Sequence, residues 1–426
     1  MMRSDDSAGL PNLAGTEWLQ RPQTRAVFDA LRADGAGVRA VGGAVRNALL
    51  GTPVKDIDIA TTAPPEEVVQ LAKRAGLHAI PTGFEHGTVT VVVDKHPFEV
   101  TTLRRDIETF GRHARVTFTT DWREDAMRRD FTMNALYCDL DGVVHDPLGG
   151  YPDLIAKRVR FIGDAHERIR EDYLRILRFF RFLAQYGDPS APDPDGLAAA
   201  RAEKSGLAQL SGERIRNELL LLLSAPRALC ALATMQEAGL IEPLLGTPGN
   251  VQLAKRLASI EAALGRAPDP ILRLAALADA PTPLLKDRLR LSLVEAGRLA
   301  DAARRDASFD PRTDEAAAKA FIYRHGPDAF VDGALIDWAR SDDPSDDRAR
   351  AERIALPQRW TPPKLPVRGA DVLALDVPAG PKVGHIVSEF EIWWIAAGYP
   401  DDPKRLHERL EQLVRDEKSP RRATDD

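Results

Sequence analysis

Cysteine is almost absent from this sequence. The 426 residues contain only two, Cys138 and Cys230, which are too few for a disulfide framework or for a zinc site of four thiolates. A pair of small thiols is typical of a protein in a reducing compartment. The sequence therefore predicts a cytoplasmic protein.

Long apolar runs are also missing. The longest candidate, residues 219–223, is far shorter than the roughly 20 apolar residues that a membrane-spanning helix needs. The first residues, MMRSDDSAGLPNLAG, include acidic side chains and lack the apolar core of a secretory signal. We expect no membrane association, and nothing in the sequence indicates a protein partner.

Lysine is scarce relative to arginine, and the total charge is negative. Of the 58 basic residues 12 are lysine and 46 are arginine, and the net charge is −6. A negative total argues against nucleic-acid binding, but it hides how the charges are distributed. Because the planar guanidinium group suits phosphates and base edges, we expect a basic inner surface with the acidic residues outside.

The order of patterns along the chain predicts an α/β N-terminal head, with a mixed sheet and helices, followed by an elongated all-α remainder. Residues 1–22 have no hydrophobic period, and we expect a disordered leader there. The head, residues 23–150, includes a β-rich stretch with a turn at Asp94-Lys95. The helical part divides into three segments, at residues 151–230, 231–360 and 361–426.

A glycine pair, Gly42-Gly43, separates a short apolar run from a helix-like run that contains Arg46. Adjacent glycines let the backbone approach a ligand closely. The helix that follows offers free N–H groups and a positive dipole end to a phosphate. A plain turn is the alternative for this pair taken alone.

Two carboxylates, Asp56 and Asp58, alternate with Ile57 and Ile59. On a strand this alternation puts both carboxylates on one face, about 6.5 Å apart along the chain. Such a pair can bridge two Mg²⁺ ions roughly 3.5–4 Å apart, although a solvated strand face has the same pattern. Glu99, at the end of the β-rich stretch, is either a third carboxylate on a neighbouring strand or an ordinary edge-strand charge.

Two further segments carry charge in patterns that suit a nucleotide. The stretch RRDFTMN offers Arg128 and Arg129 to a triphosphate, and a carboxylate or amide to a ribose; a charged helix cap is the alternative. The run EDYLRILRFFRFLAQYG predicts a helix ending at Gly187. Its charged residues recur every three positions and form one slowly rotating stripe, at Asp172, Arg175, Arg178 and Arg181. The alternative is a salt-bridged surface helix with a Glu171–Arg175 pair.

Together these segments resemble the class II tRNA nucleotidyltransferases, which are the CCA-adding enzymes and bacterial poly(A) polymerases of the polymerase-β superfamily. The matching motifs occur in order over about 180 residues, and they read GGAVRNALLG, DIDIATT, RRDFTMNAL, DPLGGYPDL, EDYLRILRFFRF and SGERIRNEL. The resemblance continues more loosely after residue 230, through LRLS and GPKVGHIVSEFEIWW. It implies a nucleotidyltransferase head, a neck with a base-reading helix, an all-α body and a tRNA-binding tail.

The resemblance also implies residue roles. Asp56 and Asp58 would bind the metal, with Glu99 as a third acidic group. Gly42, Gly43 and Arg46 would bind the triphosphate, and Arg129 would contact the nucleotide. Asp130 and Asn134 lie near the sugar or support the pocket. Asp172 and Arg175 read the base, Arg178 and Arg181 extend the basic wall, and Ser211, Glu213 and Arg214 buttress their helix. Asn47 departs from the pattern, because the family usually has Asp there.

These roles predict template-independent addition of CCA to the 3′ end of tRNA from CTP and ATP, with Mg²⁺ as cofactor. Asp172 can only accept hydrogen bonds and Arg175 can only donate them, so the pair suits the amino groups and ring nitrogens of cytosine and adenine. Uracil O4 and guanine O6 would oppose the carboxylate. Such a mismatch excludes a base by several kcal/mol.

Three alternatives stay open at this point. A poly(A) polymerase and an enzyme that adds only CC or only A share these motifs. The segment from Arg104 to Asp125 resembles the flexible loop of enzymes that add the terminal A, which disfavours the CC-only reading. An inactive RNA-binding protein is a different class, and the intact carboxylate pair argues against it.

Overall fold

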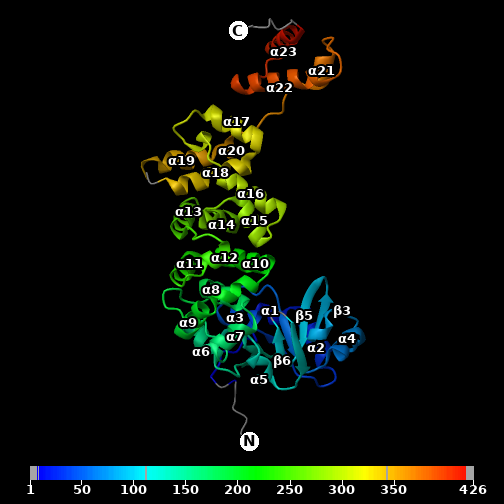
Figure 1. The fold of residues 1–426 in the computed structure, drawn as a ribbon. Coiled ribbons are helices and arrows are strands. Elements are labelled where there is room, and N and C mark those ends of the chain that lie inside the picture. Colours follow the sequence, from blue (N-terminus) through cyan, green and yellow to red (C-terminus); the bar gives the residue numbers. More distant parts are fainter. Residues whose placement is uncertain (1–6, 8, 111–112, 342–343, 419–426) are drawn as a thin grey trace. The chain divides into compact units, whose positions relative to one another are not determined.

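The computed structural model describes residues 7, 9–110, 113–341 and 344–418 (Figure 1). It divides into two compact units. The first comprises Met1–Val251, Pro268–Pro270 and Pro283–Ser292, and the second comprises Gln252–Ala267, Ile271–Thr282 and Leu293–Asp426. Helix α11 (Ala228–Glu237) runs through the predicted boundary at residue 230 and packs against α8 (Leu174–Gln185) within the first unit.

The head contains a mixed sheet, as predicted, and this sheet has seven strands. Its strand order is β3-β4-β5-β2-β1-β8-β9, and only the β2–β5 pair is parallel. The strands are β1 (Val38–Val41), β2 (Asp58–Thr61), β3 (His78–Gly83), β4 (Thr88–Val93), β5 (His96–Thr102), β8 (Tyr137–Cys138) and β9 (Val144–His145). The predicted turn joins β4 to β5: Asp94 and Lys95 have φ of 48° and 67°, as a tight hairpin turn requires.

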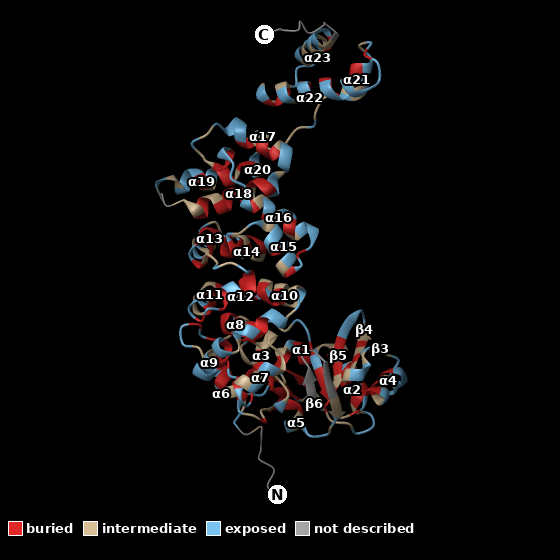
Figure 2. Ribbon diagram, in the orientation of Figure 1, coloured by how far each residue is buried: buried red, intermediate tan, exposed pale blue. Residues whose placement is uncertain are grey.

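The register of the sheet separates a buried face from a polar one. Ile59 pairs with Val100, which pairs with Val89, and all three are fully buried. Figure 2 colours the ribbon by burial and shows buried residues within the head. One residue earlier on β2, Asp58 pairs with Glu99. Because adjacent residues of a strand point to opposite faces, both carboxylates lie on the face opposite the buried one.

Helices surround the sheet and build the rest of the first unit. Helices α2 and α4 pack on the sheet, and α8 packs against α10 and α11. The helices are α1 (Glu17–Gln20), α2 (Pro22–Arg32), α3 (Gly43–Leu49), α4 (Pro65–Arg74), α5 (Trp122–Met127), α6 (Gly150–Ile155), α7 (Ala165–Glu171), α9 (Pro194–Ala202), α10 (Gly212–Leu223), α12 (Ile241–Leu245) and α15 (Thr282–Leu289), with short 3₁₀ turns η1 (Phe84–His86), η2 (Thr132–Asn134) and η3 (Lys204–Gln209).

The helix predicted from Glu171 onward is broken at its start. Helix α7 ends at Glu171, Asp172 is extended at φ −155° and ψ 106°, and α8 begins at Leu174. The side chain of Asp172 accepts a hydrogen bond from the backbone N–H of Leu174 at 3.2 Å. This local bond competes with helix continuation, so the prediction that Asp172 and Arg175 share one helix is wrong.

Two other segments also differ from expectation. The predicted disordered leader contains α1, whose Trp18 and Leu19 are buried, while residues 1–6 and 8 lie outside the described part of the chain. The predicted loop from Arg104 to Asp125 contains an antiparallel pair, β6 (Arg104–Phe110) and β7 (His113–Phe118), followed by the first residues of α5. The β-branched and aromatic residues of this stretch favour strands.

The second unit is entirely helical where the structure describes it. It contains α13 (Val251–Ala263) and α14 (Pro270–Ala278) except for their first residues, which belong to the first unit. Its other helices are α16 (Leu293–Ala303), α17 (Glu315–His325), α18 (Pro327–Arg340), α19 (Asp347–Ile354), α20 (Leu356–Arg359), α21 (Gly369–Leu373), α22 (Pro381–Ala396) and α23 (Pro403–Lys418), with short 3₁₀ turns η4 (Ala307–Phe309) and η5 (Pro344–Asp346). Val372, Phe390 and Val414 belong to one apolar cluster that joins α21, α22 and α23. None of the described helices is long and apolar enough to cross a membrane.

Candidate nucleotide-binding site

The ends of β1 and β2 bring the glycine pair beside the carboxylates. Val41, the last residue of β1, pairs with Asp58, the first residue of β2. Gly42 follows with φ 67° and ψ −115°, a conformation that side chains with a Cβ rarely adopt. Helix α3 then begins at Gly43, so its first N–H groups are at the same end of the sheet as Asp58.

The carboxylate pattern continues just before β2. Ile57 and Ile59 are buried, whereas Asp56 and Asp58 are exposed, which is the alternation that the sequence predicted. The surrounding protein partly desolvates the carboxyl group of Asp58, and this raises its pKa; the charges of Glu99 and Asp56 act in the same direction, against Arg129. A divalent cation would relieve the repulsion among these three carboxylates.

The donor set fits a metal ion that also binds substrate. Mg²⁺ is usually held by one or two carboxylates together with water and substrate phosphates. Asp56 and Asp58 supply two such carboxylates. Among the residues that the structure describes, no group of three or more His, Cys, Asp or Glu side chains is arranged to hold a metal by itself.

A cavity of about 520 Å³ opens beside Asp58 and gathers most of the predicted site. Its lining residues are Gly42, Gly43, Arg46, Asp58, Arg129, Asp130, Asn134, Asp172, Leu174, Arg175, Arg178, Phe182 and Arg214. Ten of these were named from the sequence as site residues. Three predicted residues, Asp56, Glu99 and Arg181, are not part of the lining.

Arg46 lies in the protein wall of the cavity with its donors directed at neighbouring side chains. It is 6% exposed, and burial lowers its pKa. Its Nη1 donates to Asn134 Oδ1 at 2.5 Å and its Nη2 donates to Tyr186 Oη at 2.8 Å. Asn47 accepts from Arg46 Nη2 at 3.1 Å and donates to the carbonyl of Pro53 at 3.4 Å. The amide at position 47 thus connects Arg46 to the loop that precedes β2.

Asp130 links two walls of the cavity. Its Oδ2 accepts from Arg178 Nε at 2.8 Å and from Nη2 at 2.6 Å, and its Oδ1 accepts from Asn134 Nδ2 at 2.9 Å. Burial opposes its ionisation, but the charge of Arg178 and the hydrogen bonds lower the pKa of Asp130 to about 2. The carboxylate is therefore ionised at neutral pH and fixes Arg178 of α8 against the head.

Sequence reasoning missed a buried carboxylate behind Arg129. Asp125 is 1% exposed and accepts from Arg128 Nε at 2.8 Å, from Arg129 Nη2 at 3.0 Å and from Tyr137 Oη at 2.8 Å. Burial opposes ionisation, yet the two arginines lower the pKa of Asp125 to about 2. The four-residue spacing between Asp125 and Arg129 was a signal that could have revealed this pair.

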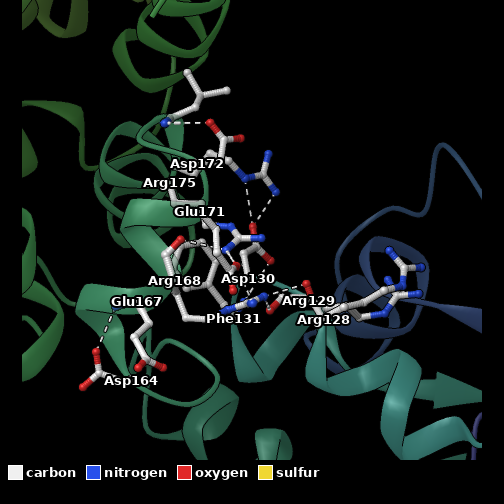
Figure 3. A network of polar contacts seen from close by, with 12 residues as sticks. Arg128, Arg129, Asp130, Phe131, Asp164, Glu167, Arg168, Glu171, Asp172 and Arg175 are labelled. Atoms are coloured by element: carbon white, nitrogen blue, oxygen red, sulfur yellow. Dashed lines mark hydrogen bonds and ion pairs between the residues drawn. The ribbon is translucent and has the colours of Figure 1, made fainter. Parts of the chain in front are cut away.

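The base-reading candidates are each held by a partner. Asp172 accepts from Arg214 of α10 through both oxygens, at 3.1 and 2.7 Å. Glu171 pairs with Arg175 (Figure 3). Arg181 instead pairs with Glu218 of α10, outside the cavity lining. Of the three predicted buttress residues, Arg214 thus contacts Asp172, Ser211 caps α10, and Glu213 is exposed.

Comparisons with known proteins show to which family the chain belongs. Residues 38–160 match the family model described as "Poly A polymerase head domain", and residues 191–249 match "Probable RNA and SrmB- binding site of polymerase A". The "CCA tRNA nucleotidyltransferase 1, mitochondrial" of Danio rerio is 36% identical over 390 residues, which cover 88% of this chain and 87% of that protein. The chain belongs to the CCA tRNA nucleotidyltransferase family.

A bacterial CCA-adding enzyme matches about half of this chain in sequence, and a bacterial structure matches most of it in fold. The "CCA-adding enzyme" of Geobacillus stearothermophilus is 40% identical over 226 residues, or 53% of this chain and 54% of that enzyme. The crystal structure of the Bacillus stearothermophilus CCA-adding enzyme in complex with CTP matches with a TM-score of 0.74 and 29% identity, covering 93% of this chain and 99% of that one. Nucleotidyltransferases of this kind generally use a divalent metal ion.

Proposed function

We propose that this protein adds CMP, CMP and AMP, from CTP and ATP, to the 3′ end of tRNA without a nucleic-acid template. The observation that carries the proposal is the cavity itself. It joins a carboxylate of the metal pair, Asp58, to an acceptor and a donor for a base edge, Asp172 and Arg175. The relatives named as CCA tRNA nucleotidyltransferases support the same activity.

The chemistry follows from which groups meet in the cavity. Asp56 and Asp58 would hold Mg²⁺, which when bound lowers the pKa of the RNA 3′-hydroxyl and neutralises charge on the departing pyrophosphate. Arg129 and Arg178 offer fixed positive charge to the triphosphate. Gly42 allows the backbone and the first N–H groups of α3 to approach a phosphate closely.

Base choice follows from the hydrogen-bonding capacity of Asp172 and Arg175. The carboxylate accepts a hydrogen bond from the amino group of cytosine or adenine, and the guanidinium donates to the neighbouring ring nitrogen. Uracil and guanine present a carbonyl oxygen to the carboxylate instead. With uracil or guanine the Asp172 carboxylate has no hydrogen-bond donor opposite it, which weakens binding of these nucleotides.

The test uses purified protein with three RNAs: tRNA lacking CCA, tRNA ending in C and tRNA ending in CC. Each labelled nucleoside triphosphate is offered singly, with Mg²⁺ or with a chelator. We expect CMP on the first two RNAs, AMP on the third, and no incorporation with the chelator. Repeated AMP addition without use of CTP would indicate a poly(A) polymerase. Failure of all nucleotides with Mg²⁺ would overturn the proposal.

The tail, residues 361–426, is proposed to bind the body of the tRNA. Arg405 and Arg409 of α23 each lie 5.7 Å from the ring centre of Trp393 on α22, and two neighbouring cations suit the phosphates of an RNA backbone. Replacing both arginines by Glu should raise the KM for tRNA and leave the KM for CTP unchanged. An unchanged KM for tRNA would contradict this role.

The proposed location is the cytoplasm. Both thiols, Cys138 and Cys230, are free, which suits a reducing compartment. The vertebrate relatives are named as mitochondrial, which is a property of those proteins. Fractionation of the source cells with an antibody against the chain tests the location.

A further inference from the structure

Arg168 of α7 contacts two segments that each contribute to the cavity lining, through Arg129 and Arg175, although Arg168 is not itself a lining residue. Helix α7 is fixed at its start by Asp164, which accepts a hydrogen bond from Glu167 N at 2.9 Å. Figure 3 shows Arg168 between the segment of Arg128 and Arg129 and the segment of Glu171 and Arg175. Its side chain is mostly buried.

On the head side, Arg168 contacts backbone rather than side chains. Its Nη2 donates to the carbonyl oxygens of Arg128 and Arg129, each at 2.6 Å. Arg128 and Arg129 are the two residues before Asp130, the carboxylate that holds Arg178. Arg168 therefore fixes the backbone that carries the wall proposed to face the triphosphate and the sugar.

On the neck side, Arg168 reaches the base-reading wall through one carboxylate. Its Nη1 donates to Glu171 Oε2 at 2.5 Å, and the same oxygen accepts from Arg175 Nη1. Arg175 Nη1 also donates to the backbone carbonyl of Arg168 at 2.7 Å. The position of the Arg175 guanidinium thus depends on both the side chain and the backbone of Arg168.

We propose that Arg168 is a positioning residue that fixes the separation between the base-reading Arg175 and the Arg129–Asp130 wall, and thereby sets nucleotide selectivity. The inference rests on the proposed function, because selectivity is defined only for an enzyme that transfers nucleotides. The fork of the guanidinium group serves two carbonyls with one nitrogen and a carboxylate with the other. A lysine ammonium is a point donor without this planar fork.

The experiment compares Arg168→Met, which keeps an apolar stem, and Arg168→Lys with the wild type. Arg170→Met is the matched control: it removes an arginine from the same helix, but Arg170 has a 58% exposed side chain and pairs with Glu203. Steady-state kinetics on tRNA lacking CCA give kcat/KM for all four nucleotides and KM for the tRNA. The fraction of folded protein is followed by circular dichroism.

We expect Arg168→Met to lower kcat/KM for CTP about 10- to 100-fold, because a small misplacement of binding groups costs this much. The ratio of kcat/KM for CTP to that for UTP should fall at least about tenfold, while KM for tRNA stays within about twofold. Arg168→Lys should lower the ratio of kcat/KM for CTP to that for UTP in the same direction, but by a smaller factor. Arg170→Met should match the wild type.

A purely structural role predicts a different result. Loss of folded enzyme lowers the rate with every nucleotide equally and leaves the ratio for CTP and UTP unchanged. An unchanged ratio in the folded Arg168 variants, or in Arg168→Lys if the Met variant does not fold, would overturn the inference. If the wild type itself transfers no nucleotide, the proposed function fails instead, which separates the two conclusions.

Discussion

Asp172 and Arg175 are the proposed base-reading pair, and replacing Asp172 by Asn exchanges one carboxylate oxygen for an amide NH₂ group. In the structure Oδ1 of Asp172 accepts from Arg214 Nη1 and from Leu174 N, and Oδ2 accepts from Arg214 Nη2. Each carboxylate oxygen has two lone-pair sites. The two bonds to Oδ1 fill that atom, and one site on Oδ2 stays available for the amino group of cytosine or adenine.

The size of the effect follows from this count. Removing one hydrogen bond to a charged group costs about 1.5–3 kcal/mol, which is roughly a 10- to 150-fold loss in kcat/KM for CTP and for ATP. The new amino group of Asn can donate to O4 of uracil or O6 of guanine. The loss with UTP and GTP should therefore be smaller, and their relative use should rise.

The assay measures kcat/KM for all four nucleotides on tRNA lacking CCA and on tRNA ending in CC. Asp188→Asn is a suitable control, because it removes an exposed carboxylate that caps Ser190 outside the cavity lining. Arg175→Ala should lower the use of CTP and ATP without raising relative UTP use, since it deletes an attraction only. Unchanged ratios in folded Asp172→Asn would refute base reading by this carboxylate.

Three further predictions concern the metal pair, the β6–β7 segment and the buried carboxylate. Asp56→Ala or Asp58→Ala should abolish incorporation of both CMP and AMP but leave tRNA binding by filter assay intact, because RNA affinity comes mainly from phosphate contacts; substantial turnover with Mg²⁺ would contradict metal ligation. A short flexible splice between Arg105 and Trp122 should reduce AMP addition more than CMP addition, and equal losses would indicate a structural element instead. The pKa of Asp125, about 2 in the folded protein, lies below its unfolded value, so its contribution of about 2 kcal/mol is present above pH 4 and lost as pH falls toward 2. Urea unfolding at pH 7, 4 and 2.5 should therefore show a smaller acid loss in Asp125→Asn than in the wild type, and parallel losses would argue against this linkage.

The parts of the site that depend on local sequence were predictable. Gly42 adopts a conformation that its lack of a side chain permits, and the alternation of Asp56 to Ile59 needs only the two-residue period of a strand. The pairing of Asp58 with Glu99 depended on which strands become neighbours. The sequence could name Glu99 as a candidate but could not show that β2 and β5 pair in parallel.

The parts that depend on tertiary contacts were not predictable in the same way. The three-residue spacing of Asp172, Arg175 and Arg178 predicted one helix, but a side-chain bond to Leu174 N ends the helical path at Asp172. The same spacing rotates by about 60° per step around a helix. Arg181 is therefore two steps, about 120°, from Arg175, which agrees with its pairing to Glu218.

The negative total charge is compatible with a cavity for an anionic substrate because the acids and the arginines are paired residue by residue. The pairs are Arg129 with Asp125, Arg178 with Asp130, Arg214 with Asp172, Arg175 with Glu171 and Arg181 with Glu218. The expectation that the acids lie outside a basic surface is therefore wrong at this site, since Asp125, Asp130 and Glu218 are buried. A guanidinium group fixed by a carboxylate needs little reorganisation when a phosphate or base arrives. Ion pairing thus lowers the net positive charge of the site, while the arginine donors stay oriented. The net charge of the whole chain could not have revealed this arrangement.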